Sequence, residues 1–303
     1  MNLRATAVQT VRLVVVIGCQ PSPEPEGEMA ITKPETTSNP GSDGVAKPDS
    51  LNHVHDAATR GDPVAQRKLG IVYLEGDLGA ARSVKEAVSW FRWAAVQGDA
   101  GAQFMLGILY DNGLGVTGSE TEAVKYYRKA SDQGLACAQV NLGVMYDMGH
   151  GVTQNETEAA RLYRLAADQG LEGGQLNLGV MYQYGRGLIK NAAEAVRLYQ
   201  MAADQEVPNA QFNLGIMYAI GEGVAENRRE AAMYYRRAAD QGHAPARHNL
   251  ESLYSFGQAT GINKTEAVKY DRLPADRGVV ADRLSLAYRV EQGEIKSEKE
   301  LVE

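Results

Sequence analysis

The stretch Ala-Gln-Val-Asn-Leu-Gly-Val-Met-Tyr at residues 138–146 recurs along the chain. Gly-Gln-Leu-Asn-Leu-Gly-Val-Met-Tyr occupies 174–182, and Ala-Gln-Phe-Asn-Leu-Gly-Ile-Met-Tyr occupies 210–218. The tyrosine that ends each copy is spaced by 37 residues once and by 36 residues thereafter, at Tyr73, Tyr110, Tyr146, Tyr182, Tyr218 and Tyr254. Self-similarity at a fixed period of this length is typical of a stacked-repeat protein.

The recurring stretch has the spacing of a helix. Gln139, Leu142, Gly143 and Tyr146 stand at i, i+3, i+4 and i+7, which places them on one helix face. Because glycine lowers helix stability relative to alanine, we expect Gly143 and its equivalents to lie where another helix approaches closely. Gly149 follows the tyrosine and predicts the helix end, since glycine readily adopts the left-handed conformation of a C-terminal cap.

A second helix is predicted by pairs in which Asn or Ser precedes Glu by three residues. The first side chain can accept from the free amides of the first helical turn, and the Glu places negative charge at the positive helix end. The pairs recur at steps of 36 residues, at Ser83/Glu86, Ser119/Glu122, Asn155/Glu158, Asn191/Glu194, Asn227/Glu230 and Asn263/Glu266. An apolar face of aromatic residues and alanines follows each pair, so each period contains two helices.

The composition restricts the class of function. The 303 residues carry a net charge of −7, and an acidic chain lacks the basic track that nucleic-acid binding needs. The two cysteines, Cys19 and Cys137, form no Cys-x-x-Cys pair, so we expect neither a disulfide framework nor a zinc site. We expect no cofactor. We also expect no transmembrane helix, because no apolar segment is long enough to cross a bilayer.

The pattern resembles the Sel-like repeat family, which is related to the tetratricopeptide repeats. The resemblance rests on the Ala-Gln-x-x-Leu-Gly-x-x-Tyr helix, the Gly-x-Gly-Val turn, the Glu-Ala-x-x-x-Tyr-Tyr-x-x-Ala-Ala helix and the Asp-Gln-Gly end, over residues 49–291. It implies an all-α, right-handed α/α superhelical solenoid of six full 36-residue helix-turn-helix repeats. Residues 51–61 and 281–290 match half-repeats and are expected to cap the two ends. Such a fold implies a binding scaffold.

The N-terminal 19 residues resemble a bacterial lipoprotein signal peptide. Val16-Ile17-Gly18-Cys19 fits the lipobox pattern, which implies lipidation of Cys19 and, with Gln20 next, an outer-membrane location facing the periplasm. Arg12 leaves a short apolar region, so a misassigned start and a cytoplasmic chain stay as the alternative. Proline-rich residues 20–48 predict a disordered linker, and residues 292–303 predict a charged tail.

A row of asparagines is the candidate binding site. Asn141, Asn177, Asn213 and Asn249 each precede the leucine of the first helix. By analogy with tetratricopeptide relatives, this position faces a groove and hydrogen-bonds a peptide. The alternative is a bond within the scaffold to an adjacent helix or turn. Apolar residues beside the row would form either a groove floor or packing between repeats, and they are Phe104, Val140, Leu176, Phe212 and His248.

The sequence contains no catalytic constellation. Gly113 to Gly118 matches Gly-x-Gly-x-x-Gly, but a dinucleotide motif needs a preceding strand, and here a helix is predicted. The leading hypothesis is a non-enzymatic scaffold that binds peptide segments or partner proteins along the solenoid and is tethered to a membrane. The alternative is a secreted hydrolase acting on cell wall or β-lactam substrates, as suggested for disulfide-bearing relatives. The missing cysteine pairs and the missing nucleophile–base pair argue against it.

Overall fold

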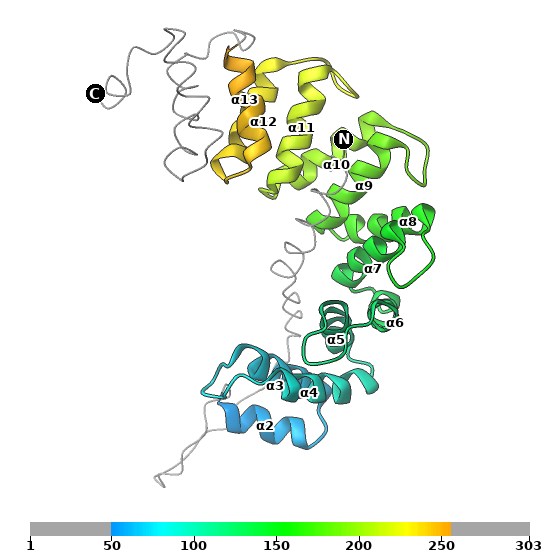
Figure 1. Cartoon of the computed structure of the whole chain (residues 1–303), viewed down its shortest axis with the longest axis vertical. Coiled ribbons are helices and arrows are strands. Elements are labelled where there is room, and N and C mark those ends of the chain that lie inside the picture. Colours follow the sequence, from blue (N-terminus) through cyan, green and yellow to red (C-terminus); the bar gives the residue numbers. More distant parts are fainter. Residues whose placement is uncertain (1–49, 256–303) are drawn as a thin grey trace, which may run out of the picture. The chain divides into compact units, whose positions relative to one another are not determined.

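The computed structural model describes residues 50–255, which form twelve helices joined by turns and loops, with no strand in this part of the chain (Figure 1). The chain divides after Gly174 into two compact units. In each unit, consecutive helices pack against one another as in a helical repeat solenoid. The second helix of the sixth repeat and the C-terminal half-repeat lie outside the described residues, as do residues 1–49.

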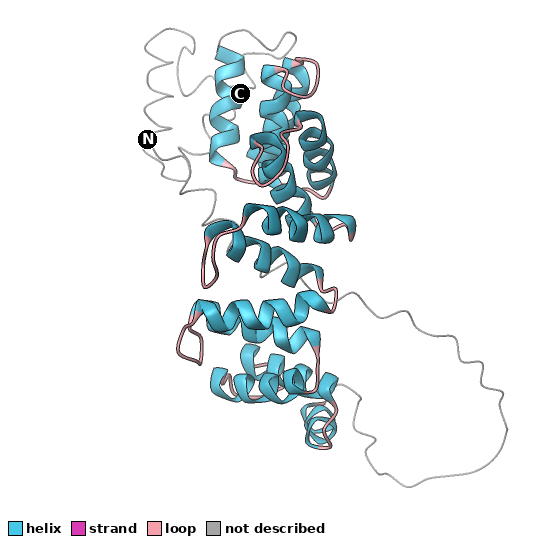
Figure 2. Ribbon diagram, turned by 90° about the vertical axis from the view of Figure 1, so that its right-hand side faces the viewer, coloured by secondary structure: helices cyan, strands magenta, loops and turns pink. Residues whose placement is uncertain are grey.

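Two helices form each repeat, as the periodicity predicts (Figure 2). The helix that carries the Gln-x-x-Leu-Gly stripe is called the first helix, and the helix after it the second helix. The first helices are α3 (Pro63–Glu75), α5 (Ala100–Asn112), α7 (Ala136–Met148), α9 (Glu172–Tyr184), α11 (Pro208–Ile220) and α13 (Ala244–Ser255). The second helices are α4 (Val84–Val96), α6 (Glu120–Asp132), α8 (Glu156–Asp168), α10 (Ala192–Asp204) and α12 (Arg228–Asp240), and α2 (Leu51–Thr59) is the predicted N-terminal half-repeat.

The predicted caps begin the second helices. Ser83 Oγ accepts from the backbone N–H of Glu86 at 3.3 Å, and Asn155 Oδ1 accepts from that of Glu158 at 3.0 Å. Ser119, Asn191 and Asn227 cap their helices in the same way, whereas Asn263 lies outside the described residues. Left-handed glycines end the first helices as predicted, at Gly76, Gly113, Gly149 and Gly221.

The glycine of each first helix lies against a buried ring of the following second helix. A Cβ added at Gly143 would lie 2.6 Å from Cε1 of Tyr163, which is 2% exposed. Carbon atoms in ordinary contact are about 3.5–4.0 Å apart, so only glycine fits here. The same arrangement joins Gly70 to Phe91, Gly107 to Tyr127, Gly179 to Tyr199 and Gly215 to Tyr235. The predicted close approach is thus confirmed, and its partner is the second large ring of the motif.

A glutamine pair links successive second helices. Gln139 on α7 is buried, and its Oε1 accepts from Nε2 of Gln169 at 2.8 Å. Gln103 on α5 makes the equivalent bond and also donates to the carbonyl of Ala95 at 3.1 Å. Gln66, Gln103 and Gln211 each donate to the helix before them and accept from the glutamine at the end of the helix after them, which satisfies a polar group inside the core. The pairs are Gln66/Gln97, Gln103/Gln133, Gln139/Gln169, Gln175/Gln205 and Gln211/Gln241.

One turn departs from the repeat pattern. Glycine follows the second helices at residues 61, 98, 134, 170 and 242, each with positive φ, but Glu206 occupies this position with φ 60°. A side chain in the left-handed region is strained. The Glu206 carboxylate pairs with Arg237 at 2.9 Å and accepts from Gln211 Nε2 at 2.8 Å. The bond from Arg237 lowers the pKa of this carboxyl group.

Within residues 50–255, each helix is too short or too polar to cross a bilayer.

Candidate functional site

The four asparagines occupy the same position on four first helices. Asn141 lies on α7, Asn177 on α9, Asn213 on α11 and Asn249 on α13, and each side chain is half-buried. The leucine that follows each of them is buried in the core. The helix geometry therefore holds the amide groups at the border between core and surface, where they are accessible in part.

Two of these amides bind a tyrosine of the preceding second helix. Asn213 hydrogen-bonds the hydroxyl of Tyr199 on α10, and Asn249 hydrogen-bonds that of Tyr235 on α12. The Tyr199 hydroxyl also donates to Oε1 of Gln183 at 2.8 Å. Burial raises the pKa of both tyrosines, and the asparagine bond partly opposes this shift. For Asn213 and Asn249, the structure thus contains a bond within the scaffold, which is the alternative to peptide binding.

Each amide has more hydrogen-bonding capacity than one tyrosine uses. An asparagine side chain offers two N–H donors and an oxygen with two lone pairs. The Nδ2 atom of Asn177 is buried and has no hydrogen-bond partner among the described residues. A buried donor of this kind costs free energy unless a further group satisfies it.

The apolar residues beside the row are mostly part of the core. Phe104, Val140 and Leu176 are at most 8% exposed. Phe212 is half-buried against the core of the second unit, and only His248 is exposed among the five neighbours of the row. Of the two alternatives, packing within the scaffold therefore holds for the three buried residues, and a groove floor does not.

A histidine caps the start of α13, at the position where Asp62 and Asp99 cap α3 and α5. His243 Nδ1 accepts from the backbone N–H of Ala246 at 3.1 Å, and Nε2 lies 3.0 Å from Oδ1 of Asn209. These two bonds fit the neutral ring with its proton on Nε2. Burial lowers the pKa of His243 and so favours the neutral form that the cap needs.

Within residues 50–255, no group of three or more His, Cys, Asp or Glu side chains is placed to hold a metal ion. The Gly-x-Gly-x-x-Gly match begins at Gly113, which caps α5, so a helix and not a strand precedes it. The lipidation candidate Cys19 lies outside the described residues.

Comparison with known proteins agrees with this architecture. The Sel1 repeat model matches residues 63–99, 100–135, 138–171, 173–207 and 208–243. A Sel1 repeat protein from Oxalobacter formigenes is 33% identical, with a TM-score of 0.66, and the alignment covers 73% of this chain and 88% of that one. The protective antigen c5321 of uropathogenic Escherichia coli, which displays an SLR fold, is 29% identical with a TM-score of 0.50, covering 84% of this chain and 62% of that one. A search of curated proteins found no match. With five matched repeats over more than half of its length, the chain belongs to the Sel1 repeat family.

Proposed function

We propose that the chain is a non-enzymatic scaffold that binds peptide segments of partner proteins through the asparagine row. Sel1 repeats are commonly protein–protein interaction scaffolds. The observation that carries the proposal is the recurrence of a half-buried amide at one position of four first helices, Asn141, Asn177, Asn213 and Asn249. An extended peptide offers a regular series of backbone N–H and C=O groups, which the amides of Asn177, Asn213 and Asn249, all in the second unit, can pair.

The bonds between tyrosine hydroxyls and asparagine amides stabilise the scaffold and also favour peptide binding by the asparagines. A bond to Tyr199 holds the Asn213 amide in one orientation and leaves other hydrogen-bonding positions of the group open. A side chain that is already ordered loses less conformational entropy when a ligand binds.

The test separates the two uses of the asparagine. Peptides selected from a random library against the wild-type chain are measured by calorimetry against Asn177→Ala/Asn213→Ala and against Tyr199→Phe. Two lost hydrogen bonds predict an affinity loss of about tenfold in the asparagine variant. Tyr199→Phe removes the bond that orders the Asn213 amide but keeps the amide itself, so it should lose less affinity than the asparagine variant does. Equal affinity in all three proteins would remove the row from the binding site.

We also propose that Cys19 carries a lipid anchor, on the lipobox at residues 16–19 alone. Two signals are needed for stable anchoring, and a diacylated N-terminal cysteine provides more than one chain. Mass spectrometry of the N-terminal peptide from the native host should find acyl groups on Cys19, and Cys19→Ser should move the protein to the soluble fraction. A Cys19 found as a thiol or in a disulfide contradicts the anchor and favours the cytoplasmic alternative.

A further inference from the structure

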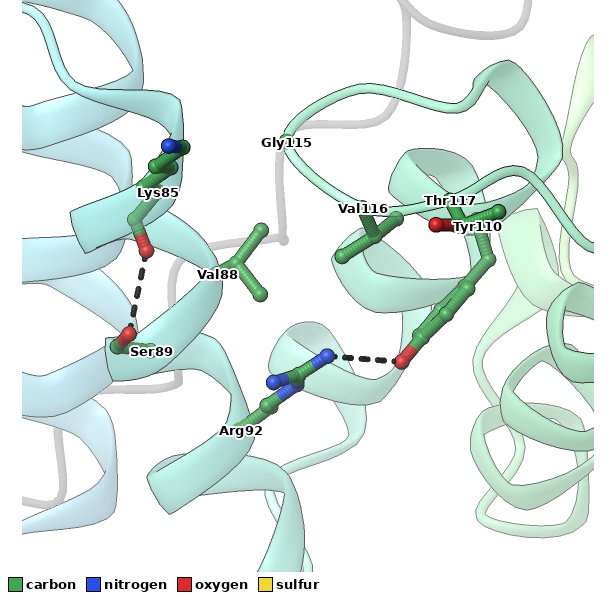
Figure 3. A pocket seen from close by; sticks show the side chains of 8 residues that line it. All are labelled: Lys85, Val88, Ser89, Arg92, Tyr110, Gly115, Val116 and Thr117. Carbon is green, nitrogen blue, oxygen red and sulfur yellow. Dashed lines mark hydrogen bonds between the residues drawn. The ribbon is translucent and has the colours of Figure 1, made fainter.

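A polar hollow of about 410 Å³ lies beside α4, separate from the asparagine row (Figure 3). Its α4 side carries two cations, and the end of α5 and the loop after it form the opposite side. The residues that line it include Lys85, Val88, Ser89, Arg92, Tyr110 and Val116. In Figure 3, Arg92 and Tyr110 point toward each other across the hollow.

The hollow exists because one residue departs from the repeat. The positions equivalent to Ser89 in the next three second helices carry long cations, each of which pairs with the glutamate three residues before it. They are Lys125 with Glu122, Arg161 with Glu158, and Arg197 with Glu194. The short Ser89 instead donates to the carbonyl of Lys85 at 3.1 Å. Ser89 therefore leaves space where the other repeats have a long side chain.

The two cations that border this space have no acidic partner. Within residues 50–255, neither Lys85 nor Arg92 forms an ion pair with a carboxylate. Arg92 Nη2 donates to the hydroxyl of Tyr110 at 3.0 Å. Because the hydroxyl accepts this bond, its own proton is available for a further acceptor. An ammonium, a guanidinium and a hydroxyl thus surround one space as donors.

We propose that this hollow binds the carboxylate side chains of an acidic peptide segment. Lys85 and Arg92 pair with the carboxylates, Tyr110 donates a further hydrogen bond, and Val88 and Val116 contact the methylene groups. Hydrogen bonds between ionised partners are about twice as strong as neutral ones, which suits an open site. A lone carboxylate would leave most of the hollow filled with water, since one water takes about 30 Å³. A peptide segment fills the space better than a free ion does.

The proposed site for acidic peptides shares no residue with the asparagine row. An experiment on one site is therefore independent of an experiment on the other. The probe is a fluorescent peptide with four consecutive glutamates, and its matched control has four glutamines. Fluorescence anisotropy at low salt should detect binding of the glutamate peptide alone, because exposed charges are screened as salt rises. Lys85→Gln and Arg92→Gln should each weaken binding by about fivefold or more.

Two further variants make the test specific to the hollow. Ser89→Arg introduces the residue that α8 and α10 carry, so it should fold, pair with Glu86, fill the space and abolish binding. Arg128→Gln is the control, because Arg128 makes the same bond to Tyr146 in the next repeat at 2.8 Å, where the long Lys125 takes the place of Ser89. Circular dichroism confirms the fold of each variant.

The proposal is overturned if the wild type does not bind the glutamate peptide or binds the glutamine peptide equally well. It is also overturned if Ser89→Arg still binds, or if Arg128→Gln loses as much affinity as Arg92→Gln. Displacement of the peptide by an equal concentration of inorganic phosphate would show a general anion site and would contradict peptide recognition.

Discussion

Replacing Gly143 by alanine tests the packing that joins the two helices of a repeat. The added Cβ would lie 2.6, 2.9 and 3.2 Å from three ring carbons of Tyr163, so the nearest is about 1 Å closer than ordinary contact allows. The ring is 2% exposed and is held among other core residues, so it has little room to move away.

The expected magnitude is the difference between two opposing effects. Overpacking of a core costs about 1–3 kcal/mol. Alanine in place of glycine in a helix gains up to about 1 kcal/mol. We therefore expect Gly143→Ala to lower the free energy of unfolding by about 1–2 kcal/mol, although the same replacement stabilises a helix that is free of close neighbours.

Urea unfolding followed by far-UV circular dichroism measures this difference. The control is Gly173→Ala on α9, where a Cβ would lie 3.6 Å from Val140, an ordinary contact. This variant should be as stable as the wild type or slightly more stable. Adding Tyr163→Leu to Gly143→Ala should recover stability, with a favourable coupling of about 1 kcal/mol between the two sites. Equal stability of the two alanine variants, or zero coupling, would refute the packing argument.

Three other predictions concern single contacts. Gln139→Leu should lower the free energy of unfolding by about 0.5–1.5 kcal/mol in the same assay, because it removes the hydrogen bond to Gln169, and an unchanged value would contradict the linking role. Glu206→Gly should raise the urea midpoint, because relief of the left-handed strain outweighs the loss of an exposed ion pair with Arg237; a lower midpoint would show the reverse. His243 has a lowered pKa in the folded chain, so the unfolded chain takes up the proton first and stability is lost as pH falls below about 6.5. His243→Asn should reduce this loss between about pH 7.5 and 5.5, and an unchanged pH dependence would exclude His243 as its source.

The helices, their caps and the helical glycines could be predicted because they depend on short, periodic sequence patterns. Asn155 and Glu158 are three residues apart, so the cap is visible within one turn. Gly143 predicts a close neighbour because glycine lowers the stability of a helix. The sequence does not show that this neighbour is Tyr163, twenty residues later. Contacts between helices depend on how the helices cross, and a single repeat does not contain that information.

The sequence predicts the glutamine pairs and the hollow less completely than the helices, because both depend on contacts between helices. Both members of the Gln139/Gln169 pair recur in the sequence, and the constant separation was the available signal for their bond. The sequence signal for the hollow beside Ser89 is a small residue where the next three repeats have a long cation, which is visible only when the repeats are aligned position by position. A search for known motifs does not detect such a departure.

Each asparagine of the row stands at a fixed distance in sequence after a tyrosine. This relation gives a sharper test of whether the asparagines bind peptides. Each of the four asparagines stands 14 residues after a tyrosine, whereas Met105 stands 14 residues after Phe91, which has no hydroxyl. Asparagine is thus absent at the repeat that lacks its hydrogen-bond partner, which indicates that the tyrosine bond alone explains part of the row.

Phe91→Tyr combined with Met105→Asn adds a fifth tyrosine–asparagine pair to the first unit. If the row binds peptides, library-selected peptides long enough to reach it should bind this variant about three- to tenfold more tightly, the effect of one additional hydrogen bond. If the asparagine serves only the scaffold, the variant should change in stability and keep the wild-type affinity. Phe91→Tyr alone is the control, because it supplies the hydroxyl without the amide. A gain in affinity from Phe91→Tyr alone would contradict the assignment of binding to the asparagine, since the ring is buried in the core.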